Sequence, residues 1–535
     1  MRIGKINFHY LGASLQQVLS SLFDLCFHLG FKPLRDAEFT LLSYRDEEGR
    51  RVYERTLQFV LIMCVRKLFP HARVVVRYSL SHGLYITIDK EPEFSEADMA
   101  ELEAEMRKAI EADMPFERKR MSIQEALKYY EADGQLDKAE LLKWRRFSYF
   151  DVYRCPLYSD YIDYFYGEMA PSTGFVTVFG LKYLPGGLVM LLPDKNAPER
   201  PIAYVDSPKM RDVFARSDKW GRLMTCSTAN ELNTRVKNGT VRELIRVNEA
   251  LHEKMYAYTA DKIIESGARA VMLAGPSSSG KTTSANRIAT QLRAEGLDPI
   301  MISLDNYYCD RDYCPRHENG DYDFEHINAL DINRFNHDLK LLMAGEECET
   351  PIFDFVTGKP KPEGRVMRCR ADQPLIIEGI HGLNPALIGD EIDSSKLFRV
   401  YVSALTTINL DDHNRVRTTD LRILRRLVRD YETRGASMER TLSMWASVRS
   451  GESKWIFPYQ EQADVILNTT LHYEPCIMKR HVYPLLLTVP PESEYYCMAR
   501  SIVKYLNYFL EADCEDEIPP TSVLREFIGG NTFYI

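Results

Sequence analysis

The amino-acid sequence predicts an α/β protein in which a doubly wound parallel sheet follows a mixed α+β region. The first observation is a glycine-rich stretch, Gly275 to Thr283, which fits the phosphate-binding loop pattern G-x-x-x-x-G-K-[ST] at every fixed position. The second is the alternation of short apolar runs with helical segments from residue 267 to about residue 475. The third is the first 235 residues, in which helix-like and strand-like stretches are mixed.

The length, net charge and composition exclude several classes of protein. The length of 535 residues suggests three or four domains at about 150 residues each. The net charge of −9 argues against a general nucleic-acid coat but leaves room for one local basic site. No apolar run approaches the roughly 18 residues needed to span a bilayer, and the N-terminus lacks a signal-peptide core. With 11 scattered cysteines, which are typical of reduced thiols, we expect a cytoplasmic protein without membrane contact.

The N-terminal region divides into a small α+β module, residues 1–50, and a longer block, residues 51–235. Ser95 with Asp98 and Ser122 with Glu125 each place an acidic residue three positions after a serine and ahead of a helical pattern, which predicts two capped helix starts. The expected elements are a helix over 53–68, strands over 73–78 and 84–89, and helices that begin after Ser95 and Ser122.

Residues 236–266 are expected to form one connecting helix, and residues 476–535 a helical extension with a helix over 502–510. Along the connector, apolar residues recur at near-heptad spacing, namely Leu244, Val247, Leu251, Met255 and Tyr258. This stripe fits a helix packed on the following sheet, and it also fits the seam of a homo-oligomer.

Residues 267–475 supply apolar strand candidates separated by helices, which predicts a parallel sheet covered on both faces. The first strand leads directly into the glycine-rich loop, and Ser284 to Arg293 continues as a helix. The strands are expected at residues 268–274, 299–304, 374–377, 397–402 and 463–467.

The loop has the composition that phosphate binding requires. Its glycines let backbone N–H groups close on phosphate oxygens, and the helix N-terminus adds partial positive charge. Lys281 can reach the β- and γ-phosphates, and Thr282 can bind Mg²⁺. We therefore expect ATP or GTP with Mg²⁺ as cofactors, held by Gly275, Pro276, Ser277, Ser278, Ser279, Gly280, Lys281, Thr282 and Thr283.

Two acidic residues stand at the ends of predicted strands. Asp305 ends the strand after the loop, where ligands bind in doubly wound folds. A carboxylate there can accept the proton of an acceptor hydroxyl, although capping a loop is the commoner role for such an aspartate. Glu378 follows the strand Leu375–Ile377 and can hold Mg²⁺ directly or through water, or instead cap a turn.

Seven arginines lie between residues 415 and 434. Arg422, Arg425, Arg426 and Arg429 fall on adjoining faces of one predicted helix. Such a run is usually a solvated basic face, but beside a phosphate loop it favours a mobile cationic lid over the triphosphate.

Further motifs follow the loop in a fixed order. They are D-N-Y-Y at 305–308, F-E-H-I-N-A-L-D at 324–331, P-I-F-D-F at 351–355, E-G-I at 378–380 and D-L-R-I-L-R-R-L-V-R-D-Y-E-T-R-G at 420–435. By these motifs, residues 267–470 resemble the uridine kinase and phosphoribulokinase family, with the fold of a P-loop kinase.

The resemblance implies roles for individual residues. Asp305 is expected to be the base for a sugar 5′-hydroxyl, and Arg422 and Arg425 to contact the acceptor and the phosphates. Lys281 joins them as a catalytic residue. The remaining roles implied are nucleotide binding by Arg426 and Arg429, metal binding by Thr282 and Glu378, and an acceptor pocket of Tyr308, Phe324, Glu325, Phe353 and Phe355.

Four departures from the family pattern concern the acceptor. Glu325 replaces an aspartate, and Phe353 stands where pyrimidine nucleoside kinases use tyrosine. Gly358 and Met444 stand where the resemblance leads us to expect a base-reading histidine and glutamine. Because a site that hydrogen-bonds a base discriminates through those polar groups, we expect intact phosphate chemistry with relaxed or changed pyrimidine specificity.

The first 200 residues or so resemble the N-terminal half of threonyl-tRNA synthetase, a TGS-like module followed by the second additional domain. The stretches that carry this resemblance are 55–59, 68–70, 83–85, 103–118 and 151–156. In that family an H-x-x-x-H motif and a Cys-x-x-x-His pair form the deacylation site. Here the four positions hold Arg55, Phe59, Tyr153 and Leu157, and none of them is a credible metal ligand. We expect that this region keeps the fold of the synthetase domains but has lost the hydrolytic site. We do not expect it to bind nucleic acid, although its resemblance leaves that alternative open.

The sequence therefore predicts an ATP-dependent kinase that phosphorylates a hydroxyl of a nucleoside or related small molecule. One alternative is a kinase of a sugar, sugar phosphate or pantothenate-like substrate. Another is an RNA-binding, translation-linked regulator that uses the kinase fold as a nucleotide switch. The acidic balance, the missing editing ligands and the complete acceptor-side motifs count against the regulator.

Overall fold

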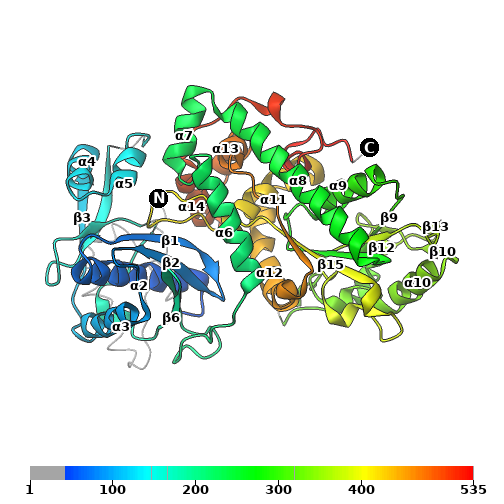
Figure 1. The fold of residues 1–535 in the computed structure, drawn as a ribbon, viewed down its shortest axis with the longest axis horizontal. Helices are drawn as coiled ribbons and strands as arrows, with labels where there is room; N and C mark the ends of the chain where they lie inside the picture. Colours follow the sequence, from blue (N-terminus) through cyan, green and yellow to red (C-terminus); the bar gives the residue numbers. More distant parts are fainter. Residues whose placement is uncertain (1–42, 146–147, 166, 319, 534–535) are drawn as a thin grey trace.

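The computed structural model describes residues 43–145, 148–165, 167–318 and 320–533. The module predicted at residues 1–50 lies outside the described residues, apart from residues 43–50. Within these ranges, no helix combines the length and the apolar character needed to cross a membrane. In Figure 1 the N-terminal half lies on the left in blue and cyan, and the parallel sheet lies on the right.

The second half of the described chain is built on a five-stranded sheet whose neighbouring strands are all parallel. The first strand along the chain lies at the centre, in the spatial order β16-β15-β8-β14-β9. The strands are β8 (Ala270–Ala274), β9 (Ile300–Ser303), β14 (Leu375–Glu378), β15 (Leu397–Ser403) and β16 (Val465–Asn468). This arrangement confirms the predicted doubly wound sheet.

Helices cover both faces of this sheet, which is why its strands are almost continuously apolar. Along β8, Val271 and Leu273 face one core cluster, and Ala270 and Met272 face the other. The first face packs against α8 (Val241–Ser266), α9 (Lys281–Ala294), α11 (Thr418–Arg434), α12 (Met438–Trp455) and α13 (Glu474–Leu487). The second packs against α10 (Ile332–Ala344).

The C-terminal extension belongs to the same core. Leu506, Val523 and Phe527 are fully buried in the cluster that covers the first face of the sheet. They come from α14 (Tyr496–Leu506) and from the segment around α15 (Arg525–Ile528). The helix predicted over 502–510 therefore begins six residues earlier than expected, at Tyr496, and ends at Leu506.

The N-terminal half contains an antiparallel sheet in the order β1-β2-β7-β6. Residues 56–65 are buried without exception, so α2 forms the centre of this half. Its main elements are α2 (Glu47–Leu68), β1 (Arg73–Leu80), β2 (Gly83–Asp89), α3 (Glu96–Glu111), β6 (Gly180–Leu184) and β7 (Gly187–Leu191). A smaller unit holds β3 (Glu117–Ser122), α4 (Ile123–Ala132), α5 (Leu136–Leu142), β4 (Tyr149–Arg154) and β5 (Ile162–Asp163). The capping boxes predicted at Ser95 and Ser122 are both confirmed.

The connector differs from the single helix predicted over residues 236–266. After α6 (Pro208–Leu223), α7 (Ala229–Asn238) ends at Gly239, whose φ of 75° is left-handed, and α8 starts only at Val241. Glycine adopts this conformation without strain and so ends the helix. Leu244 is buried against the core, while Tyr258 at the other end of the heptad stripe is 53% exposed. A homo-oligomeric seam stays a prediction.

The two halves are joined through the loop between β15 and α11. The backbone N–H of Val76 in β1 donates to the carbonyl of Asp412 at 2.8 Å, and Asn409 Nδ2 donates to the Val76 carbonyl at 2.8 Å. Beside this contact, Asp163 Oδ2 lies 2.6 Å from His413 Nδ1 in a buried hydrogen bond. The loop that leads into α11 is therefore anchored in the N-terminal half.

Candidate nucleotide and acceptor site

The glycine-rich loop joins β8 to α9 at the C-terminal edge of the sheet (Figure 1). A side chain at Gly275 would lie 2.0 Å from the carbonyl oxygen of Val402, so the neighbouring strand requires glycine there. Gly280 has a φ of 83° and immediately precedes α9, and as a glycine it provides no side-chain cap. The helix begins at Lys281, three residues before the predicted Ser284, and its first N–H groups lie at the end where phosphates are expected.

Arg422 and Arg425 of α11 lie beneath the loop. Arg422 Nη1 donates to the Ser277 carbonyl at 3.0 Å, and its Nη2 donates to Glu452 at 2.7 Å. Arg425 Nη2 donates to Glu474 at 2.7 Å. Both arginines are fully buried, so this part of α11 is a brace under the loop and not the exposed, mobile lid that we expected.

The other two arginines of the predicted set face the ligand side more directly. Arg426 Nη1 donates to the Ser277 hydroxyl at 2.8 Å, and its positive charge acts on Glu325. Arg429 is paired with Asp430 at 3.0 Å, and its charge acts on Asp305. Their predicted contact with a nucleotide stays a prediction.

Carboxylates from two adjacent strands meet beside the loop lysine. Glu378 ends β14 and is paired in register with Ser303 of β9, whose hydroxyl donates to Glu378 at 2.8 Å. Burial and the negative charge of Asp305 raise the pKa of Glu378 to about 7, against the opposing charge of Lys281. Part of Asp305 is exposed to solvent, but many protein atoms surround its carboxyl group. This desolvation raises the pKa of Asp305 too. The structure thus brings Lys281, Asp305 and Glu378 together.

The metal prediction can be compared with the side chains present. In the described ranges, no group of three or more His, Cys, Asp or Glu side chains is arranged to hold a metal ion by itself. Thr282 is the second residue of α9, and Glu378 ends the strand next to β8. A hydroxyl and a carboxylate fit Mg²⁺, which usually completes its coordination with water and substrate phosphates.

Three of the predicted acceptor residues form an aromatic cluster. Tyr308 lies 5.7 Å from Phe353 and 6.4 Å from Phe355 between ring centroids, and the two phenylalanines are 5.1 Å apart. The Tyr308 hydroxyl donates to the carbonyl of Phe324 at 3.2 Å, and the Phe324 ring is 44% exposed. Burial, then the charge of Glu452, raise the pKa of Glu325 to about 7. These residues therefore offer a partly exposed apolar surface with one carboxyl beside it.

An arginine occupies the place where a base-reading histidine was expected. Gly358 has a φ of 73°, and a side chain there would lie 2.5 Å from the Arg311 guanidinium. The backbone N–H of Arg311 also donates to the Gly358 carbonyl at 2.9 Å. Arg311 lies between the recognised motifs, so sequence reasoning had no signal for it. Met444, at the other altered position, lies on α12 and is partly exposed.

The C-terminal segment also reaches the loop, as the red segment beside α9 in Figure 1 indicates. Thr283 donates to Glu526 Oε2 from its hydroxyl at 2.7 Å and from its backbone N–H at 3.3 Å. Asn531 Nδ2 donates to the same hydroxyl at 3.3 Å, and a Gly280 side chain would lie 2.5 Å from Val523. A carboxylate thus occupies donors at the start of α9, and the sequence carried no motif that would have indicated it.

The parallel sheet, the phosphate loop and the acidic strand ends define a P-loop protein of the doubly wound α/β class. Residues 270–472 match the phosphoribulokinase / uridine kinase family. The uridine kinase of Staphylococcus haemolyticus is 31% identical over 196 residues, which are 36% of this chain and 84% of that protein. The chain belongs to the phosphoribulokinase / uridine kinase family. A solved possible uridine kinase from Bacillus stearothermophilus is 17% identical, with a TM-score of 0.29 over 40% of this chain and 98% of that one.

The N-terminal region has its own relatives. Threonine–tRNA ligase of Carboxydothermus hydrogenoformans is 31% identical over 166 residues, which are 30% of this chain and 25% of that protein. The chain thus spans about a quarter of the length of the threonine–tRNA ligases it matches. At the four positions named above, Phe59 and Tyr153 are buried in the core, Leu157 is 72% exposed and Arg55 is partly buried.

Proposed function

We propose that this protein is an ATP- or GTP-dependent, Mg²⁺-requiring kinase that transfers a phosphoryl group to a hydroxyl of a nucleoside or related small polyol. The observation that carries the proposal is the meeting of Lys281, Asp305 and Glu378 at the C-terminal edge of the sheet. Family membership supports the reaction class, and the partly exposed aromatic cluster supports a small acceptor with a flat ring.

Each residue has a chemical task in this reaction. The first N–H groups of α9 and the Lys281 ammonium hold the β- and γ-phosphates. Thr282 and Glu378 hold Mg²⁺, which when bound neutralises charge on the phosphates. Asp305 takes the proton of the acceptor hydroxyl. Because burial raises the pKa of this carboxyl, it is a stronger base than an aspartate in water, and the charge of Lys281 favours the ionised form that the task needs.

The chemistry of the acceptor is indicated by Arg311, which lies beside Gly358. A guanidinium only donates hydrogen bonds, whereas a neutral histidine both donates and accepts. Arg311 beside Gly358 therefore favours acceptors that present carbonyl or hydroxyl oxygens, without the paired reading of a pyrimidine edge. We propose a nucleoside or polyol acceptor phosphorylated at the 5′-type hydroxyl, with weak preference among bases.

A donor-consumption screen tests this function. The full-length protein is incubated with Mg²⁺ and ATP or GTP against panels of nucleosides, sugars and sugar phosphates. With the best acceptor, Asp305→Asn should lower kcat by about 10²-fold or more, because general-base catalysis contributes that much, while nucleotide affinity stays within a few-fold. Asp312→Asn, an exposed aspartate nearby, is the matched control and should keep its activity.

The screen also separates the alternatives. Lys281→Ala should abolish turnover and weaken nucleotide binding together. Full activity in Asp305→Asn removes Asp305 as the base. A clear preference for uridine and cytidine over every other acceptor overturns the relaxed specificity, and nucleotide binding without phosphorylation of any acceptor favours a nucleotide switch.

A further inference from the structure

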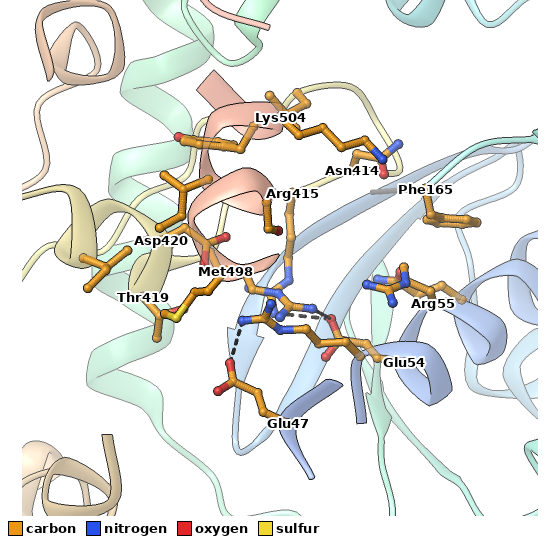
Figure 2. Close-up of a pocket in the computed structure, with 18 of the residues that line it drawn as sticks. Glu47, Glu54, Arg55, Phe165, Asn414, Arg415, Thr419, Asp420, Met498 and Lys504 are labelled. Carbon is orange, nitrogen blue, oxygen red and sulfur yellow. Dashed lines mark hydrogen bonds and ion pairs between the residues drawn. The ribbon is translucent and has the colours of Figure 1, made fainter. Parts of the chain in front are cut away.

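Two cavities adjoin where the N-terminal half meets the second half, away from the phosphate loop. One of about 120 Å³ is lined by α2, the loop before α11, the start of α11 and α14 (Figure 2). The other, of about 390 Å³, is lined by the small β3-β4-β5 unit and α14. Both have Phe165 and Lys504 in their walls, so together they form one cleft, which we call the interdomain cleft.

The interdomain cleft concentrates positive charge in an acidic protein. Among described residues, the smaller cavity has five basic side chains, Arg51, Arg55, Arg415, Arg417 and Lys504, against the three acidic ones of Glu47, Glu54 and Asp420. The larger has four basic side chains, including Arg118, Arg145 and Arg500, against Asp151 and Glu168. Each cavity therefore has an excess of two positive charges, while the whole chain carries −9.

The charges of two of these arginines are only partly compensated by neighbouring groups. Arg415 is only 10% exposed, its Nη2 lies 3.6 Å from Glu54 Oε1, and its Nε has no hydrogen-bond partner. Arg55 donates from Nε to the carbonyl of Glu168 at 2.9 Å, and no carboxylate of the described chain lies within ion-pair distance of it. Figure 2 shows Arg55 and Arg415 pointing toward the same space beside Glu54.

The electrostatics of both arginines indicate a missing negative charge. Burial, and after it the positive charge of Arg417, lower the pKa of Arg55 to about 10. Burial also lowers the pKa of Arg415, and Glu54 opposes this shift. A bound anion would stabilise both cations by the same Coulombic effect that a neighbouring carboxylate provides.

The start of α11 adds the positive end of a helix dipole to this charge. Arg417, the residue before the helix, provides no side-chain cap, and Thr419 and Asp420 of the first turn line the smaller cavity. A helix N-terminus favours anions, and arginine binds phosphate oxygens through two parallel hydrogen bonds. Phe165 and Tyr149 provide flat apolar walls next to these donors.

We propose that the interdomain cleft binds a small phosphorylated anion of nucleotide size. The phosphate lies against Arg55, Arg415 and the start of α11, and the larger cavity holds the rest of the molecule. The larger cavity has a volume in the range of small-molecule sites, which favours a metabolite over an RNA chain.

Binding at this cleft is connected to the phosphate loop through α11. The first turn of the helix lines the cleft, and in the next two turns Arg422 and Arg426 contact Ser277 of the loop. An anion that orders the first turn therefore acts on the loop through one rigid helix. This connection, unlike the binding itself, rests on the proposed function.

Calorimetric titration of the full-length Lys281→Ala protein tests the binding. The variant weakens binding at the phosphate loop, and the probes are inorganic pyrophosphate and a nucleoside monophosphate. We expect binding of at least one probe, with tighter binding of the monophosphate if the larger cavity holds the base. Adding Arg415→Gln or Arg55→Gln should weaken it at least tenfold, because a charge-assisted hydrogen bond contributes about that much. Adding Arg293→Gln, a half-exposed arginine of α9, should leave it unchanged.

Unfolding is monitored in the same samples, because Arg415 is buried; Arg55 is partly exposed and provides the second, independent variant. Failure of both probes to bind Lys281→Ala overturns the proposal, as does equal binding in the Arg55→Gln and Arg293→Gln proteins. Salt-sensitive binding of single-stranded RNA that is tighter than either probe also overturns it, in favour of a nucleic-acid site. None of these outcomes depends on kinase activity.

Discussion

Three carboxyl groups beside the phosphate loop have raised pKa values in the ligand-free protein, which favours their protonated form. The pKa of Glu378 and that of Glu325 are both raised to about 7, and that of Asp305 is raised as well. Burial is the largest cause in each case, and the negative charge of Asp305 adds to the shifts of Glu378 and Glu325. Positive charge from Lys281 opposes all three shifts. In the ligand-free site, protons bound to these carboxyl groups therefore neutralise part of its negative charge.

This arrangement predicts a dependence of stability on pH. For Glu378 the pKa rises from 4.5 in the unfolded chain to about 7 in the native protein, so the native state binds more protons between these values. The stabilisation is complete below pH 4.5 and is lost as the pH rises to about 7, by at most about 1.4 kcal/mol per pH unit. In nucleotide-free, EDTA-treated protein, Glu378→Gln should therefore lose less thermal stability between pH 5 and 7.5 than the wild type.

Thermal scans at a series of pH values measure this difference. Glu347→Gln, an exposed glutamate on β10 (Glu347–Thr350), is the matched control and should follow the wild-type curve. Parallel curves for Glu378→Gln and the wild type would show that Glu378 does not titrate in this range.

At the scale of elements, α11 and the C-terminal segment determine the surroundings of the loop. The buried arginines of α11 bind loop carbonyls from below, and Glu526 of α15 accepts from Thr283 at the start of α9. The motif directs phosphates to the same end of α9. We therefore expect Glu526 and a nucleotide to compete for the same donors, with a shift of the C-terminal segment when a nucleotide binds.

Removal of the Glu526 charge should tighten nucleotide binding. We expect Glu526→Gln to lower the Kd for ATP by about three- to thirtyfold, because a carboxylate at a helix N-terminus contributes about 0.5–2 kcal/mol. Calorimetric titration measures the affinity. Glu511→Gln, an exposed change in the same C-terminal region, should leave it unchanged. Unchanged or weaker binding by Glu526→Gln means that the contact does not compete with the nucleotide.

These two elements also mark how far sequence reasoning could go. The strands of the parallel sheet were predictable because burial on both faces leaves continuous apolar runs between turns. Lys281, Asp305 and Glu378 could be selected because the expected phosphoryl transfer needs such groups at the ends of those strands; the structure brings the three together, and their roles stay a prediction. The burial of Arg422 and Arg425 was not predictable, since their partners Glu452 and Glu474 lie 30 and 49 residues away. The break at Gly239 had a local signal, a glycine inside a helical pattern, and could have been found.

At the scale of the molecule, the two halves share one buried polar network. Asp163 Oδ2 and Lys138 Nζ lie 2.6 and 2.7 Å from His413 Nδ1, and Lys138 is ion-paired with Asp163. Burial alone would raise the pKa of Asp163, but Lys138 and His413 hold it well below its usual range. His413 lies in the loop that leads into α11, so the network connects the N-terminal half to the helix that braces the phosphate loop. The N-terminal half thus has a structural role in positioning α11, whatever else it binds.

Loss of the Asp163 charge should therefore loosen the whole molecule. Asp163→Asn leaves the Lys138 ammonium buried without its counter-ion, and loss of one partner costs about 3–5 kcal/mol in comparable buried pairs. We expect a lower calorimetric transition temperature, faster proteolysis in the loop of residues 404–417 and weaker nucleotide binding. Asp133→Asn breaks a more exposed pair with Arg66 within the N-terminal half, which is worth at most about 1 kcal/mol. Equal stability and equal nucleotide affinity in the two variants would mean that the network does not couple the halves. A transition lowered only for Asp163→Asn, together with weaker nucleotide binding, would place the structural link between the N-terminal half and the phosphate loop at His413.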